Sequence, residues 1–149
     1  MRRDDHVVSW ARAGDQLVVA SRFGLWWPEG DAHRMIGWEL IDKAVWGDGR
    51  LTVIEADVVD DTFLIERPAV AVELTDPRDL PPTIRKRVES SVNRSEVVAV
   101  PGGSARFVAR RVPGRDGVTW WVRLEGGLQP DEDVRETVGA LLAELRSSA

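Results

Sequence analysis

The first half of the chain is divided into short apolar segments, separated by turn-forming residues roughly every 8–12 positions. Val7–Ala11 and Leu17–Ala20 flank the turn at Ala13–Asp15, and the turn at Gly47–Gly49 precedes Leu51–Ile54. Short segments joined by glycine-containing loops are typical of antiparallel strands. The pattern therefore predicts an antiparallel sheet that curls into a sandwich or a barrel. The expected strands are Val7–Ala11, Leu17–Ala20, Phe23–Trp27, one continuous strand from Arg34 through Ile41 to Trp46, Leu51–Ile54, Phe63–Ile65 and Val70–Leu74.

Two later segments follow a helical period instead. Pro81 and Pro82 fit the first turn of a helix, where the amide groups have no helical partner. Ile84, Val88 and Val92 continue this segment at four-residue spacing, and Asn93 predicts its end. The C-terminal segment has a wider apolar face, which predicts an amphipathic helix packed on a sheet. That face consists of Val134, Val138, Leu141, Leu142 and Leu145.

Three further strands are expected between the helices, at Glu96–Val100, Ala105–Val112 and Thr119–Glu125. The fold class is therefore α+β: a mainly antiparallel, partly open barrel or curled sheet with one mid-chain helix, then a βββα extension that ends in the C-terminal helix. A length of 149 residues suits one domain, or one domain with a small extension. We expect a β-rich unit over residues 1–94 and a βββα unit over residues 95–149, which either share one core or pack as two.

Four stretches between Gln16 and Val53 repeat the order of apolar strand, short turn and hairpin: Leu17–Ser21, Leu25–Trp27, Arg34–Ile41 and Ala44–Val53. This order resembles the central strands of bacterial pleckstrin-homology-like domains, and the whole chain resembles small actinobacterial proteins. The resemblance implies a seven-stranded barrel closed at one end by a helix, here residues 80–93. Phosphoinositide-binding members of that family carry a basic cluster around the first hairpin, whereas this chain has only Arg12 and Arg22 there, with Asp15 between them. The βββα unit has no counterpart in a minimal domain of this kind.

The composition excludes several classes of function. The chain has no cysteine, which removes disulfides, thiol catalysis and cysteine-based metal sites. Its net charge of −5 disfavours binding to nucleic acids and to anionic membranes. No HExxH, GxxxxGK[ST], GxGxxG or GxSxG motif occurs, so we expect no catalytic residues, no cofactor and no metal ligands. No apolar stretch approaches the ~20 residues that span a bilayer, and we expect a cytoplasmic protein without integral membrane association.

The clearest candidate for a binding surface lies on the last two strands. If Val112 faces Thr119, one face of this hairpin is mostly apolar and suits the final helix. The other face pairs Arg110 with Trp121, so that a guanidinium can stack on an indole. The candidate interaction surface is Arg106, Val108, Arg110, Trp121 and Arg123. The alternative is that this face packs against the β-rich half and that Trp121 is simply part of the core.

Two hypotheses for the function follow. The first is a non-catalytic protein-interaction module that presents arginine and tryptophan to a protein partner or to a second copy of the chain, since these residues are enriched at interface hot spots. The second is a binder of a small anionic ligand or lipid headgroup at the mouth of the barrel, lined by Arg22 and by Trp26 or Trp27. Neighbouring residues on a strand point to opposite faces, so only one of the two tryptophans can belong to the core on a given side.

Overall fold

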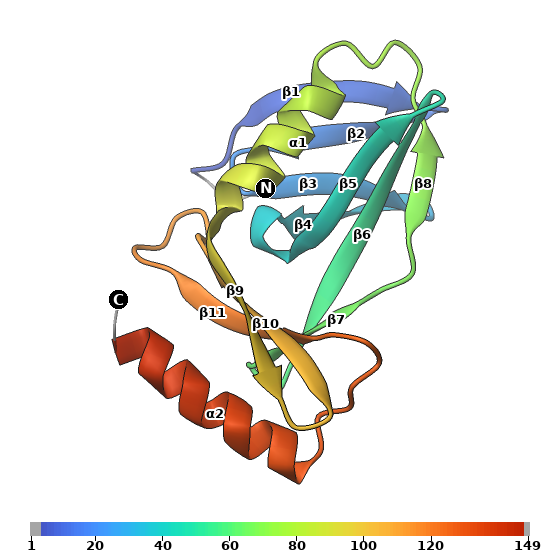
Figure 1. Ribbon diagram of the computed structural model, residues 1–149. Coiled ribbons are helices and arrows are strands. Elements are labelled where there is room, and N and C mark those ends of the chain that lie inside the picture. Colours follow the sequence, from blue (N-terminus) through green and yellow to red (C-terminus); the bar gives the residue numbers. More distant parts are fainter. Residues whose placement is uncertain (1–3, 148–149) are drawn as a thin grey trace.

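The computed structural model describes residues 4–147, and the predicted α+β class is confirmed. Mostly antiparallel strands form a curled half-barrel, with one helix in the middle of the chain and one at its C-terminal end (Figure 1). The first sheet contains four antiparallel strands in chain order: β1 (Val7–Ala13), β2 (Gln16–Ser21), β3 (Gly24–Glu29) and β4 (Ala32–Gly37).

The predicted continuous strand from Arg34 to Trp46 is wrong. A 3₁₀ turn, η1 (Trp38–Leu40), ends β4, and β5 (Ile41–Gly47) then starts the second sheet. The chain must turn here because Trp38 is buried in the core, where its Nε1 donates a hydrogen bond to the carbonyl oxygen of Ser21 at 3.0 Å. Hydrophobic periodicity alone did not show this corner, since Trp38 and Ile41 would also suit an apolar strand.

The second sheet has the order β5, β6 (Arg50–Val59), β7 (Phe63–Glu66), β11 (Thr119–Leu124), β10 (Gly103–Arg110) and β9 (Val92–Val100). An additional strand, β8 (Val70–Glu73), pairs with the first half of β6, and the second half of β6 pairs with β7. All pairs are antiparallel except β7 with β11, which meet in parallel at Phe63 and Val122. The long strand β6 therefore connects the two halves of the molecule (Figure 1).

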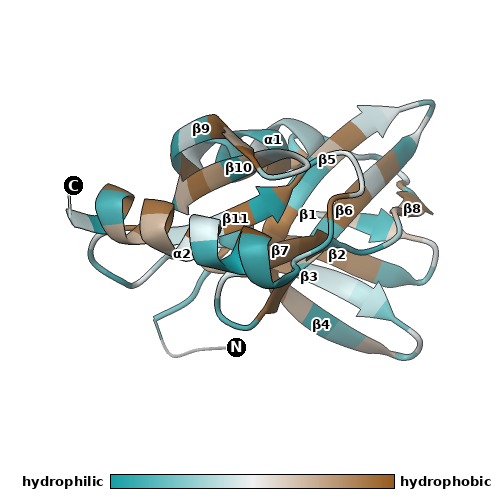
Figure 2. Cartoon of the chain, turned by 60° about the horizontal axis from the view of Figure 1, so that its bottom comes forward, coloured by the Kyte–Doolittle hydropathy of each residue, from teal (hydrophilic) through white to brown (hydrophobic). Residues whose placement is uncertain are grey.

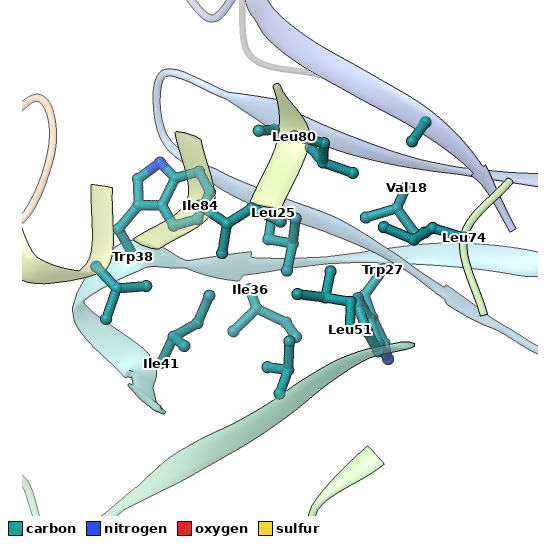
Figure 3. Close-up of a cluster of buried hydrophobic side chains, with 14 residues drawn as sticks. Val18, Leu25, Trp27, Ile36, Trp38, Ile41, Leu51, Leu74, Leu80 and Ile84 are labelled. Carbon is teal, nitrogen blue, oxygen red and sulfur yellow. The ribbon is translucent and has the colours of Figure 1, made fainter. Parts of the chain in front are cut away.

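Helix α1 (Leu80–Ser91) closes one side of the half-barrel. Its buried residues Leu80 and Ile84 pack into a core with residues of both sheets, such as Leu25 of β3 and Leu51 of β6 (Figure 3). The predicted stop at Asn93 is two residues too late. The helix ends at Ser91, whose hydroxyl donates to the carbonyl oxygen of Val88 at 2.7 Å, and β9 begins immediately at Val92.

Helix α2 (Glu132–Ser147) covers one face of β9, β10 and β11 and completes a second core. Val134, Val138 and Leu142 are buried, as predicted, while Leu141 and Leu145 are partly buried against the same cluster. Figure 2 shows hydrophobic and hydrophilic segments alternating along this helix, as an amphipathic helix requires. No helix in residues 4–147 is long and apolar enough to cross a membrane.

The division predicted at residue 94 stays a prediction, but β7 from the first part of the chain pairs with β11 from the second part. Phe63, from the first half of the chain, belongs to the core under α2. A smaller cluster of Ala56, Leu64 and Trp121 lies between the two large cores, next to Leu40. The halves are thus joined both by main-chain pairing and by apolar packing.

Candidate functional site

A groove with a volume of about 530 Å³ lies between strand β5 and helix α1. It is bordered on one side by five consecutive residues of β5, Asp42–Trp46, and on the other by one face of α1. A side chain on every position of a strand can line a groove only when the groove follows the strand's edge, because alternate side chains point to opposite faces. The groove therefore follows β5 along its length and reaches Leu51 on the neighbouring strand β6. The α1 residues at the groove are Pro81, Pro82, Arg85, Val88 and Glu89.

The free edge of β5 offers hydrogen-bonding groups of the main chain. Gly47 pairs with Arg50 across the two-residue loop Asp48–Gly49, and residues that close such a loop form a hydrogen-bonded pair. Because hydrogen-bonded pairs alternate along the ladder, Ala44 and Trp46 direct their N–H and C=O groups away from β6. No other described strand pairs with β5. The edge is therefore unpaired in the sheet, with α1 packed beside it.

Apolar side chains at this edge are unusually exposed. Val45 and Trp46 are 46% and 40% exposed. Trp46 lines the groove together with Pro81 and Pro82, which have no N–H group and thus leave that wall apolar. The charged residues at the groove carry both signs, and Arg85 is paired with Glu89 at 3.3 Å. The site has the chemistry for an extended chain with an apolar side chain, and no nucleophile or acid–base pair is assembled in it.

The predicted pairing of Arg110 with Trp121 is wrong by two residues in register. Arg110 lies opposite Thr119, and Trp121 lies opposite Val108. A shift of two residues keeps each side chain on its predicted face, so the division of the hairpin into two faces is retained. Beyond Arg110, which is paired with Val92 of β9, the N–H of Arg111 donates to the carbonyl oxygen of Ser91 at 2.8 Å.

The inner part of the predicted interaction surface is covered by the half-barrel. Arg110, Trp121 and Val108 are 5%, 8% and 7% exposed, whereas the side chains of Arg106 and Arg123 are 40% and 26% exposed. The structure thus decides between the two alternatives for Trp121, which is part of the small cluster between the halves. In the isolated chain these five residues do not form one exposed surface.

Two ionisable residues near this junction, the buried Arg110 and the partly buried Glu39, lack part of their hydrogen bonding within the described part of the chain. Arg110 donates to the hydroxyl of Ser91 at 2.8 Å, but its Nε and the Oε2 of Glu39 have no hydrogen-bond partner among the described residues. Burial lowers the pKa of Arg110, although the charges of Asp42 and Glu39 oppose this shift. Burial also raises the pKa of Glu39. Desolvation of charge is the common cause, and it disfavours both ionised forms.

Arg123 holds the two halves together electrostatically. One of its terminal nitrogens, Nη1, lies 2.5 Å from Asp42 and 2.9 Å from Glu66. The pKa of Glu66 is raised, first because its carboxyl shares a hydrogen bond with Asp42 and then through burial. A pocket of about 430 Å³ lies beside Glu66 and Arg123, where β7 and β11 separate after their single paired position. Two glutamates, Glu66 and Glu125, line this pocket beside the single cation Arg123, so its charge disfavours an anionic ligand.

The alternative mouth at Arg22, Trp26 and Trp27 is not brought together in one place. Trp27 is buried and lines a cavity of about 270 Å³ between the sheets, whereas Trp26 lines a shallow depression on the outer face. Arg22 precedes β3 and lies over the ring of Phe23 at 5.1 Å. In the Trp27 cavity the cations are paired: Arg34 and Arg67 lie 2.5 and 3.0 Å from Glu55. The predicted anionic-ligand site therefore has no unpaired guanidinium in this cavity.

Sequence reasoning missed the groove because it treated the region from Arg34 to Trp46 as one strand and did not place helix 80–93 beside it. The available signals were the exposed position of Trp46 before a tight turn and the proline pair at the start of the helix. Residues 4–147 contain no group of three or more histidine, aspartate and glutamate side chains that could hold a metal ion. No protein-family model matches the chain, and neither does any curated protein or solved structure with which it was compared.

Proposed function

We propose that this protein is a non-catalytic interaction module that binds an extended segment of a partner protein in the groove between β5 and α1. The bound segment adds a strand to the sheet at β5 and places an apolar side chain between Trp46 and the two prolines of α1. The observation that carries this proposal is the coincidence of an unpaired strand edge with an apolar groove along the same five residues. Main-chain pairing supplies affinity in such complexes, and the groove supplies specificity.

The arrangement of two sheets with α1 across them also supports the pleckstrin-homology-like resemblance, which we propose for the part of the chain up to Ser91. Strands β1–β4, then β5, β6 and β8, and then the helix follow the order that the resemblance implies. A short bridge between Arg12 and Thr75 brings the end of β8 to β1 and narrows the opening between the sheets. The extension from β9 onward, together with β7, is an addition to that unit.

The first test is selection of peptides from a displayed random library against the wild-type protein. The variant Trp46→Ala removes the groove wall, and truncation of a central interface tryptophan typically weakens binding by about 30-fold or more. Trp10→Ala is the matched control, because Trp10 is also 40% exposed but lies on β1 outside the groove. We expect selected peptides to lose affinity for Trp46→Ala and to retain it for Trp10→Ala.

The second test distinguishes strand addition from simple apolar contact. A selected peptide is resynthesised with one N-methyl group at a time, and each version is titrated against the unmodified protein. An added strand loses affinity at every second position, because alternate N–H groups point toward β5. Equal sensitivity at all positions, or peptides that bind both tryptophan variants alike, would overturn the proposal.

A further inference from the structure

The opposite edge of the seven-stranded sheet is also open. Strand β9 pairs with β10 on one side and with no described strand on the other. It spans nine residues, and most of its side chains are exposed, with Val97 at 55%. Its edge contains no proline or lysine, two of the residues that commonly prevent an edge from pairing with another chain. Helix α2 lies along one face of β9 and forms a shallow pocket with Glu96 and Val98, but it does not pair with the edge of the strand.

The hydrogen-bonding phase of this edge follows from the hairpin to β10. Val100 and Gly103 pair across the two-residue loop Pro101–Gly102, so their main-chain groups bond to each other. Alternation along the ladder then directs the N–H and C=O groups of Ser95, Val97 and Ala99 outward. Asn93 is the extra residue of a bulge and has no partner on β10. A second strand can therefore pair with β9 only in a register that places its own unpaired N–H and C=O groups opposite those of Ser95, Val97 and Ala99.

We propose that β9 pairs antiparallel with β9 of a second copy of this chain, with the two-fold axis at Ser95. Ser95 of each copy then faces Ser95 of the other and exchanges two main-chain hydrogen bonds. Arg94 faces Glu96 of the second copy, and by symmetry this ion pair forms twice. These pairs occupy non-hydrogen-bonded positions, where opposite side chains are closest.

The charge pattern selects this register among those that the hydrogen-bonding phase allows. With the axis at Arg94, Arg94 would lie opposite Arg94 of the second copy, and with the axis at Glu96, Glu96 would lie opposite Glu96. Like charges directly opposite one another are destabilising. With the axis at Val97, Arg94 and Glu96 would face valines. Only the axis at Ser95 brings opposite charges together. In the isolated chain Arg94 and Glu96 already form an ion pair at 2.5 Å, so the dimer would gather four charges of alternating sign.

The test is sedimentation equilibrium of charge variants, with wild type measured up to about 1 mM, the weak limit of specific association. Arg94→Glu and Glu96→Arg each convert two attractions into two repulsions and should weaken the dimer by about tenfold or more. An equimolar mixture of these two variants should restore association as a heterodimer. The double variant Arg94→Glu/Glu96→Arg should also dimerise. Because restored association requires folded chains, the mixture is its own folding control.

A main-chain variant tests the same edge independently. Val97→Pro removes an N–H group that points away from β10 and is tolerated at an edge position, so it should yield a folded monomer. A wild-type protein that stays monomeric at about 1 mM overturns the proposal. So does a mixture of the two single variants that associates no better than either alone. A dimer that Val97→Pro leaves unchanged would place the interface elsewhere and overturn it as well.

Discussion

Replacing Trp121 by alanine should destabilise the protein strongly, because this side chain connects the two halves. It is 8% exposed and packs with Ala56 and Leu64, while its neighbour across the strand, Val108, is also buried. A buried tryptophan removes roughly 200 Å² from water, which at about 25 cal/mol per Å² corresponds to about 5 kcal/mol. Alanine retains part of this area, and the measured cost of Trp→Ala in cores is about 3–5 kcal/mol.

The assay is urea unfolding followed by far-ultraviolet circular dichroism, together with calorimetry. For a chain of this length a loss of 3–5 kcal/mol lowers Tm by roughly 10 °C. Trp10→Ala provides the reference, since Trp10 is 40% exposed and its main contact is the guanidinium of Arg78, 4.2 Å from the ring centre. Its cost should stay below about 1 kcal/mol. If Trp121→Ala cost no more than Trp10→Ala, the assignment of Trp121 to the junction would be refuted.

Two other predictions concern pH and helix capping. Arg34 lowers the pKa of Glu55 in the folded state. The ionised carboxylate therefore stabilises the fold above the unfolded pKa of about 4.5, and this contribution is lost as the pH falls through the folded pKa. Glu55→Gln should flatten the acid side of a stability profile measured by urea unfolding. Glu39 behaves oppositely, because burial raises its pKa and the native state binds more protons than the unfolded state. Stability should fall as pH rises from about 4.5 through the folded pKa, and Glu39→Gln should remove that fall; an unchanged profile would contradict it. Asp131 accepts a hydrogen bond from the N–H of Val134 at 2.9 Å at the start of α2, so Asp131→Ala should cost about 1 kcal/mol by thermal unfolding, whereas a neutral result would exclude capping.

The sequence was sufficient to predict which face of each strand is buried but not which residues lie opposite one another. Alternation places Phe107 and Val122 on the face under α2, and they are buried there. The same alternation is satisfied by registers that differ by two residues, so it could not show that Arg110 faces Thr119. The register depends on how much of the segment between the strands forms the loop, and here residues 111–118 connect Arg110 to Thr119.

The candidate site was beyond prediction for a related reason. The helical stripe at α1 and the turn at Gly47–Gly49 were predicted correctly, but β5 was predicted only as the end of one longer strand from Arg34. Whether a strand lies at the edge or in the middle of a sheet depends on its partners, and β7 pairs with the nearby β6 on one side and with the distant β11 on the other. A parallel pair such as β7 and β11 leaves no local signature, since no hairpin loop joins the two strands.

The two proposed interfaces use opposite edges of one sheet, and this makes them separable. Dimerisation through β9 adds a strand partner at one end and leaves β5 free in each copy, so the dimer would present two grooves. A protein partner with two such segments would then bind more tightly than either segment alone, by an effective concentration set by the spacing of the grooves. Val97→Pro should abolish that gain while leaving the affinity for a single peptide unchanged. Trp46→Ala should weaken the single-peptide affinity and leave the dimer intact. If either variant changed both properties, the two edges would be coupled through the sheet.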